Sequence, residues 1–95
     1  MKSIEFGSYI KQLREAKALP QRLVAHRLNI DTSTLSKIEL GERQVTIDMI
    51  EGLADILQCD FKDLQIRYIT NKIKDDFKGQ KYLKEAIENI LKQLK

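Results

Sequence analysis

Apolar residues recur along most of the chain at intervals of three and four, which is the spacing of one face of an α-helix. The first segment with this pattern covers residues 5–17, and the second begins at Pro20 and runs to Leu28. Proline has no backbone N–H group and is tolerated in the first helical turn, so Pro20 suits the start of a helix. We therefore predict two amphipathic helices here. In the second helix, the residues available for burial are Leu23, Val24, Ala25 and Leu28.

A third helix is predicted over residues 32–40 from the residues that flank it. Asn29 precedes it, and asparagine tolerates the left-handed conformation that a sharp turn between helices needs. Asp31 suits the N-cap, because its carboxylate can accept hydrogen bonds from the free N–H groups of the first turn. Gly41 occupies the position that commonly ends a helix. The residues expected on the buried side are Leu35 and Ile38.

Three more helices are predicted in the second half of the chain. Thr46 and Asp60 are suitable N-caps for a fourth and a fifth helix, and Gly79 separates the fifth from a last helix that begins at about Lys81. The apolar face of the fourth helix comprises Ile47, Ile50, Leu53, Ala54 and Leu57. The fifth is expected to bury Phe61 and Leu64 and to continue through Ile66, Ile69 and Ile73 to Phe77. The pattern thus predicts an all-α fold.

Length and composition fit one globular domain with a terminal appendage. The chain has 95 residues, of which 42% are hydrophobic and 33% charged, and these proportions are ordinary for a folded protein. Its net charge of +3 is unevenly distributed: residues 1–45 contain eight basic and five acidic residues, residues 46–65 one and five, and residues 66–95 eight and four. This distribution predicts a body with a basic face and an acidic face.

Several classes of protein are disfavoured by what the sequence lacks. Cys59 is the only cysteine, so no disulfide can form within the chain. No apolar run approaches the roughly 20 residues that span a bilayer, and the N-terminus has too few apolar residues for a signal peptide. We therefore expect a cytoplasmic protein that does not enter a membrane.

Catalytic chemistry has few candidate residues. The sequence has no His/Cys cluster with metal-ligand spacing, no glycine-rich phosphate loop and no nucleophile motif. Asp75 and Asp76 are neighbours on a helix and point in different directions, which argues against a shared metal. We expect that the protein is not an enzyme and uses no metal or cofactor. Of the remaining distinctive residues, His26 is expected on the solvent side, and Cys59, Phe6, Phe61 and Phe77 in the core.

The second and third predicted helices carry the main signal for function. Their short turn requires a steep crossing, so the third helix projects from the body. Its outward side has short hydroxyl groups and one lysine, in place of the charged residues usual on a projecting helix: Thr32, Ser33, Thr34, Ser36 and Lys37. Short side chains let a helix approach base edges, and a lysine can donate to guanine O6 and N7. The pattern favours DNA binding over the alternative, a plain helical hairpin with serine and threonine on its exposed side.

Phosphate contacts are expected on either side of this third helix. Gln21 lies at the N-terminus of the second helix, where backbone N–H groups and its own amide can hold a phosphate. Arg43 and Gln44 follow the third helix in a loop that can contact the neighbouring phosphates.

A larger set of residues matches the pattern of a known family. They are Gln21, Val24, Ala25, Leu28, Ile30, Ser33, Thr34, Leu35, Ser36, Ile38, Glu39, Gly41, Leu53, Ala54 and Leu57. Through them, residues 6–64 resemble the Cro/cI-type (phage lambda repressor-like) helix-turn-helix family. The resemblance implies a five-helix domain that binds double-stranded DNA with its third helix in the major groove. The roles that it implies are base reading by Thr32, Ser33, Ser36 and Lys37, and backbone contacts by Gln21, Arg43 and Gln44. It also implies an ion pair between Arg14 and Glu39 that orients the third helix.

Four residues depart from the family pattern. Asn29 stands where glycine is usual, and Pro20 stands where a serine or threonine cap is frequent. Val45 replaces a frequent proline, which predicts a less rigid loop after the third helix. Leu40 replaces a polar or basic residue, so we expect no phosphate contact at that position.

The chain is predicted to divide into a DNA-binding domain, residues 1–65, and a C-terminal helical extension, residues 66–95. In the last helix, apolar residues recur at alternating steps of four and three, which is the a/d spacing of a coiled coil. They are Leu83, Ile87, Ile90 and Leu94, with Leu91 beside them. The repeat is shorter than the about three to four heptads that a coiled coil needs, so the stripe must pack on something. A second copy of the chain is favoured over its own domain or a different protein.

The function predicted from these features is that of a homodimeric, sequence-specific DNA-binding regulator, acting as a repressor. Two half-sites about one DNA turn apart need two copies of the third helix, which agrees with a dimer. One alternative is an antitoxin, or another interaction protein, that binds a protein partner through its last helix. A controller protein of a restriction–modification system is a variant within the regulator class. A helical adaptor without DNA binding is the remaining alternative.

Overall fold

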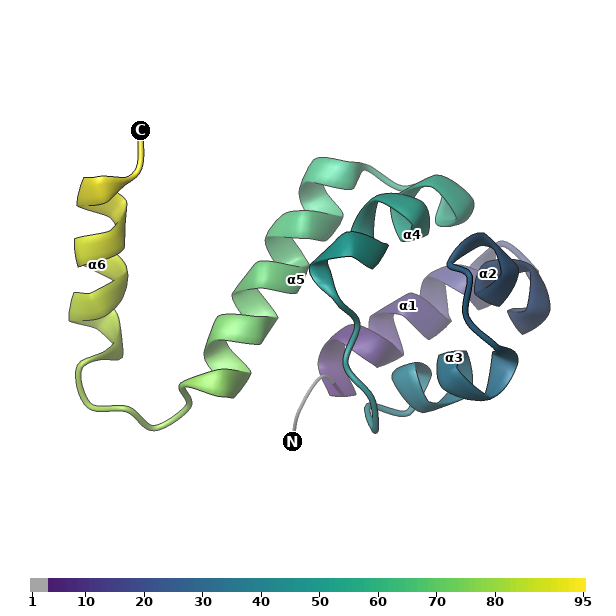
Figure 1. The fold of residues 1–95 in the computed structure, drawn as a ribbon, viewed down its shortest axis with the longest axis horizontal. Coiled ribbons are helices and arrows are strands. Elements are labelled where there is room, and N and C mark those ends of the chain that lie inside the picture. The colour runs from purple at the N-terminus through teal and green to yellow at the C-terminus, as the bar shows by residue number, and fades with distance from the viewer. Residues whose placement is uncertain (1–3) are drawn as a thin grey trace.

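The computed structural model describes residues 4–95, and these form six α-helices and no strand (Figure 1). The helices are α1 (Ile4–Ala16), α2 (Gln21–Arg27), α3 (Thr32–Glu39), α4 (Ile50–Leu57), α5 (Phe61–Asp76) and α6 (Leu83–Gln93). A single 3-10 turn, Ile47–Met49, leads directly into α4. The all-α prediction is confirmed, and each predicted helix is present with ends that shift by a few residues.

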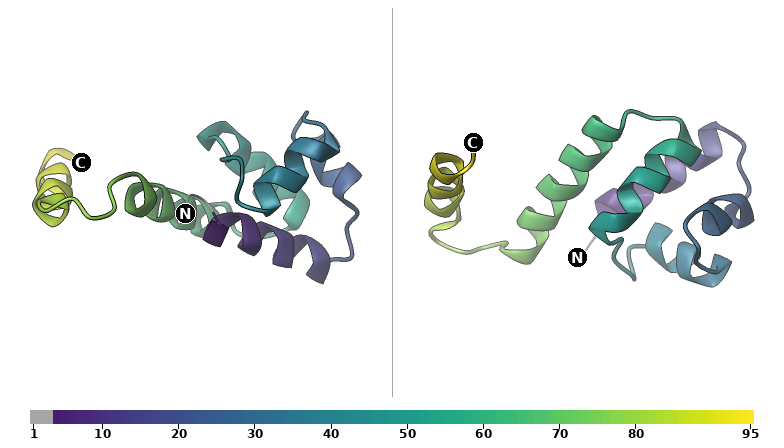
Figure 2. Two further views of the ribbon diagram at one scale, coloured as in Figure 1. Left: turned by 90° about the horizontal axis from the view of Figure 1, so that it is seen from below. Right: turned by 45° about the horizontal axis from the view of Figure 1, so that its top comes forward.

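Helices α1 to α5 surround one apolar core. The largest fully buried side chains come from all five of them: Ile10, Val24, Leu35, Ile38, Ile50, Leu53, Leu57 and Leu64. The rings of Phe6 in α1 and Tyr68 in α5 meet edge to face, with centroids 5.4 Å apart. Burying each large apolar side chain stabilises the fold by about 1.5–3 kcal/mol. The core therefore holds α3 firmly at one end of the molecule (Figures 1 and 2).

Close packing of α1 on α3 depends on a glycine. A Cβ atom added at Gly7 would overlap the backbone carbonyl oxygen of Ile38, near the C-terminus of α3. No rotamer can relieve a clash with a backbone atom, so a side chain here would push the two helices apart. Gly7 thus allows α1 to support α3 at short distance.

Four residues expected in the core are exposed instead, and one of them, Phe77, lies at the end of α5. The others are Leu23, Ile47 and Phe61. Only a narrow stripe of the short helix α2 faces the core, and Val24 and Ala25 fill it. Ile47 lies in the 3-10 turn before α4, so it does not share the register of the buried face of α4. Phe61 is the first residue of α5, and side chains in a helix lean toward its N-terminus, which carries this ring past the end of the packed surface.

Helix α5 buries a different face from the one that its isoleucines suggested. Leu64 and Tyr68 enter the core, whereas Ile66, Ile69 and Phe77 are exposed. The expected boundary between residues 65 and 66 lies inside this continuous helix. Tyr68, beyond that boundary, belongs to the core of the first five helices.

Helix α6 stands apart from the rest of the molecule in all three views (Figures 1 and 2). None of its residues is buried. Its apolar stripe does not pack on the chain's own domain, which was one of the alternatives considered from the sequence. The stripe members are Leu83, which is half-buried, and the exposed residues Ile87, Ile90, Leu91 and Leu94.

Two further properties concern the residues that the structure describes. None of the helices within residues 4–95 is both long and apolar enough to cross a bilayer. Over the same range, no group of three or more His, Cys, Asp or Glu side chains gathers in a way that could hold a metal ion.

Candidate nucleic-acid interface

The turn between α2 and α3 has the geometry expected from its sequence. Asn29 adopts a left-handed conformation with φ of 58°. The N–H group of Ile30 then donates to the carbonyl of Ala25 at 3.0 Å and closes the end of α2. This reversal lets α3 begin within a few residues at a steep angle to α2. The role predicted for Asn29 is confirmed.

Asp31 caps the first turn of α3. Its Oδ1 accepts hydrogen bonds from the Thr34 N–H group at 2.8 Å and from the Ser33 hydroxyl at 3.1 Å. The bonds from Thr34 are the main reason that the pKa of Asp31 is lowered, and the Ser33 bond lowers it further. The carboxylate therefore stays ionised at neutral pH and neutralises part of the positive end of the helix dipole. The cap predicted from the sequence is confirmed.

The outward side of α3 presents most of the residues predicted to read bases. Thr32, Ser33 and Lys37 are exposed, and Ser36 is half-buried. The Ser33 hydroxyl donates to Asp31, so its lone pairs remain for a donor on a base edge. Leu40, at the C-terminal end of the helix, is 60% exposed. The surface is thus small, polar and positively charged at one position, with an apolar residue at its edge.

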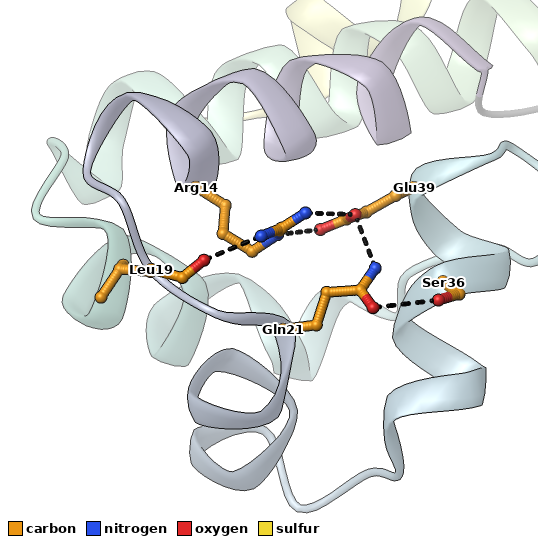
Figure 3. A network of polar contacts seen from close by, with 5 residues as sticks. All are labelled: Arg14, Leu19, Gln21, Ser36 and Glu39. Carbon is orange, nitrogen blue, oxygen red and sulfur yellow. Dashed lines mark hydrogen bonds and ion pairs between the residues drawn. The ribbon is translucent and has the colours of Figure 1, made fainter.

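A buried ion pair holds the inner side of α3 (Figure 3). The Arg14 Nε donates to Glu39 Oε2 at 2.7 Å, and Arg14 Nη2 donates to Glu39 Oε1 at 3.1 Å. A third bond, from Arg14 Nη1 to the Leu19 carbonyl, measures 2.8 Å. The hydrogen bond to Glu39 raises the pKa of Arg14 above its ordinary value. The expected pair is therefore formed, and it ties α1 and the α1–α2 turn to α3.

Gln21 extends this pair into a network between α2 and α3 (Figure 3). Its Nε2 donates to Glu39 Oε1 at 3.0 Å, and its Oε1 accepts from the Ser36 hydroxyl at 3.2 Å. The amide that the sequence assigned to a phosphate is engaged within the protein, as is the hydroxyl proton of Ser36. The reason is that α2 and α3 meet where both side chains project. The side chain of Gln21 therefore connects α2 to α3, and its contact with a phosphate stays a prediction.

The loop from Gly41 to Thr46 is held from both sides. The N–H groups of Glu42 and Arg43 donate to the Lys37 carbonyl at 2.8 and 3.3 Å, which ties the start of the loop to α3. Arg43 is exposed, whereas Gln44 is half-buried. The structure therefore places Arg43 where a phosphate can reach it. The Oε1 of Gln44 faces α5, where it accepts a hydrogen bond from Lys72.

Two residues of α5 contact this loop and were not identified from the sequence. The Tyr68 hydroxyl donates to the Val45 carbonyl at 2.7 Å. The Lys72 ammonium donates to Gln44 Oε1 at 3.0 Å and to Asp76 Oδ2 at 2.7 Å. One signal was available, because positions 64, 68, 72 and 76 recur at steps of four and share a face of α5. A tyrosine and a lysine that follow a core leucine in this way mark a face that is buried at one end and polar at the other.

The remaining distinctive residues lie away from this surface. His26 is exposed, as predicted, and Cys59 is half-buried rather than fully buried. Burial raises the pKa of the Cys59 thiol, so it is protonated at neutral pH. Arg27 and Asp55 form an exposed ion pair at 3.1 Å between α2 and α4.

Comparisons with known proteins agree with this geometry. Residues 10–64 match a helix-turn-helix family model, and no curated protein matches the sequence. The chain is similar to a solved structure, the restriction-modification controller protein C.AhdI from Aeromonas hydrophila. The TM-score is 0.58 and the identity 33%, over 64% of this chain and 88% of that protein.

The chain therefore belongs to the Cro/cI-type helix-turn-helix family. As a member of this family, it is a DNA-binding transcription regulator.

Proposed function

We propose that the protein is a cytoplasmic repressor that binds a specific DNA sequence as a homodimer, with α3 of each subunit in the major groove. The observation that carries this proposal is the contrast between the two sides of α3. Its inner side is tied to α1 by the buried Arg14–Glu39 pair, and its outer side presents hydroxyl groups and one lysine. A rigid helix with short polar side chains suits readout of base edges. We propose a binding function and no catalytic one.

The proposed division of roles follows the positions of the side chains. Thr32, Ser33 and Lys37 contact base edges, and Lys37 donates to guanine O6 or N7. Ser36 contributes from the edge of the surface, because its hydroxyl proton is already donated to Gln21. The backbone contacts come from the N-terminal turn of α2, which begins at Gln21, and from the two loop residues Arg43 and Gln44.

The proposed dimer forms through α6. Its exposed apolar residues are Ile87, Ile90, Leu91 and Leu94, with Leu83 half-buried at the start of the helix. A row of apolar side chains at these steps is stabilised when a second helix covers it. Figure 1 shows α6 and α3 at opposite ends of the molecule, so pairing through α6 leaves both copies of α3 free to bind DNA. Two linked copies bind two half-sites more tightly than one copy binds one, because the second contact becomes intramolecular.

Repression follows from occupancy. A dimer that covers two successive half-sites prevents other proteins from using the same stretch of DNA. In the second candidate function, the protein controls a restriction–modification system, and the observation in its favour is the 33% identity to the controller protein C.AhdI. Endonuclease and methyltransferase genes beside the gene for this protein would support that candidate. A toxin gene there, with a complex formed through α6, would support the antitoxin alternative.

Selection of bound sequences from random duplexes tests the proposal. We expect a two-fold symmetric consensus with two half-sites. With about 6–10 phosphates contacted by the dimer, raising the salt from about 50 to about 200 mM lowers the affinity by about 10³–10⁵. Failure to enrich any sequence, with equal weak binding to all duplexes, would contradict sequence-specific regulation.

A further inference from the structure

The loop between α3 and α4 is connected to α5 by two side chains that have no role in the function proposed so far. Tyr68 donates to the Val45 carbonyl, and Lys72 donates to the Gln44 amide oxygen. The other end of the loop is bonded to the Lys37 carbonyl in α3. The loop is therefore hydrogen-bonded to α3 at its start and to α5 further along, and its geometry depends on both helices.

Tyr68 is a rigid support for this loop. It is 8% exposed, and its ring packs edge to face on Phe6. Burial raises the pKa of its hydroxyl, so the group keeps its proton and acts as a donor over the physiological pH range. Because packing fixes the ring, its hydroxyl stays in one position as the hydrogen-bond donor to the Val45 carbonyl.

Lys72 fixes which end of the Gln44 amide faces outward. An ammonium group has only donors, so it must bond the amide oxygen. The NH₂ end of Gln44, which is a donor, is then left for an acceptor such as a phosphate oxygen. Asp76, one turn further along α5, accepts from the same ammonium at 2.7 Å and holds it in place. Without Lys72, the amide could turn its oxygen toward a phosphate and repel it.

We propose that Tyr68 and Lys72 are positioning residues for DNA binding, which hold the loop so that Arg43 and Gln44 meet the DNA backbone. The inference rests on the proposed backbone contacts of those two residues. It also gives α5 a function beyond the core: the helix that leads to α6 supports the loop that contacts phosphates.

Three variants of the full chain test this role. Tyr68→Phe removes one hydroxyl and no charge, and Lys72→Met removes the donor but retains the length of the side chain. Lys74→Met is the matched control, because Lys74 is an exposed lysine on the same helix, two positions further along. Two measurements are made on each: amide hydrogen exchange of residues 42–46 in the free protein, and binding to selected and random duplexes over a range of salt concentrations.

We expect faster exchange across the loop in Tyr68→Phe and Lys72→Met, with Lys74→Met unchanged. Affinity should fall about three- to tenfold in each of the first two variants, which is the usual effect of removing one hydrogen bond. The decrease should be equal on selected and random duplexes. The slope of affinity against salt should fall by about one for each phosphate that the loop no longer neutralises. A purely structural role would lower the melting temperature without changing that slope.

Two outcomes would overturn the proposal. One is unchanged loop exchange in Tyr68→Phe and Lys72→Met, which would show that the two bonds do not hold the loop. The other is faster exchange with binding and salt slope equal to those of the unmodified protein. If the unmodified protein binds no duplex, the proposed DNA contacts are wrong. The exchange measurement then still shows whether α5 holds the loop.

Discussion

Arg14 of α1 and Glu39 of α3 are joined by two hydrogen bonds, of 2.7 and 3.1 Å, in an ion pair almost fully removed from solvent. The two residues are far apart in the sequence, so the pair can form only when α1 and α3 are packed together. Charge-assisted, two-point contacts of this kind fix an orientation as well as a distance. The pair therefore fixes the orientation of α3 relative to α1.

Breaking this pair should strongly destabilise the fold. Glu39→Ala leaves the buried guanidinium of Arg14 without its partner, and we expect the free energy of unfolding to fall by about 3–5 kcal/mol. Replacing both residues, as in Arg14→Met with Glu39→Leu, should recover most of that stability, because no buried charge remains. Urea unfolding of Arg14→Met, Glu39→Leu and the double variant measures the coupling. Additive effects of the two changes would contradict the role assigned to the pair.

Lys37 is predicted to discriminate between bases. Lys37→Ala should weaken binding to the selected duplex by about 1–3 kcal/mol and relax the preference at one base pair of each half-site. Binding to random duplexes should change much less. The control is Lys92→Ala, which removes the same charge from α6 at the other end of the molecule. Equal weakening on selected and random duplexes would mean that Lys37 contacts only phosphate.

The cap of α3 should make stability depend on pH in the acid range. The pKa of Asp31 is lowered in the folded protein, chiefly by its bonds from Thr34. Its contribution is complete above the ordinary aspartate pKa and disappears as the pH falls through the lower, folded value. We therefore expect the melting temperature to fall as the pH is lowered past about 4.

The variant Asp31→Asn tests the capping role of this residue separately from its titration. Asparagine is also a good N-cap but has no proton to gain, so this variant should lose part of the acid sensitivity. Asp31→Ala should be less stable than the unmodified protein at neutral pH. Identical melting curves for Asp31→Ala and the unmodified protein between pH 3 and 7 (about the range where the aspartate titrates) would show that the cap does not contribute.

Gly7 should not tolerate a larger residue. Alanine favours a helix over glycine by about 1 kcal/mol, but its Cβ at this position overlaps the Ile38 carbonyl. We expect Gly7→Ala to lower the free energy of unfolding by about 1–3 kcal/mol, as overpacking commonly does. In Gly52→Ala, the new Cβ meets side-chain atoms of Arg27 and Leu28 at 3.1 and 3.2 Å, which can move. Thermal melting that shows Gly52→Ala to be the more damaging change would contradict the packing described for α1 and α3.

The oligomeric state tests the role of α6. Removing residues 80–95 should convert a dimer to a monomer, and Ile87→Glu should do the same by placing a charge in the apolar stripe. Lys92→Glu, which introduces the same side chain outside the stripe, is the control. Sedimentation equilibrium gives the mass of each form. If the shortened chain remains a dimer, pairing does not occur through α6.

Much of the fold and part of the site could be predicted from the sequence, because the responsible chemistry is local. Asn29 can adopt a left-handed conformation, Asp31 can cap its own helix, and the spacing of Leu35 and Ile38 depends only on the helical repeat. The hydroxyl groups of α3 were found in the same way. These properties hold whatever else the chain contacts.

The tertiary structure decided every question that depends on which of two possible faces meets the rest of the chain. Helix α5 has one apolar face with Leu64 and Tyr68 and another with Ile66 and Ile69, and only packing against α1 and α4 selects the first. The sequence does not say which side chain the amide of Gln21 meets, and the crossing of α2 and α3 brings the amide to Glu39. Helical periodicity says which residues share a face, whereas burial of that face is a long-range property of the folded chain.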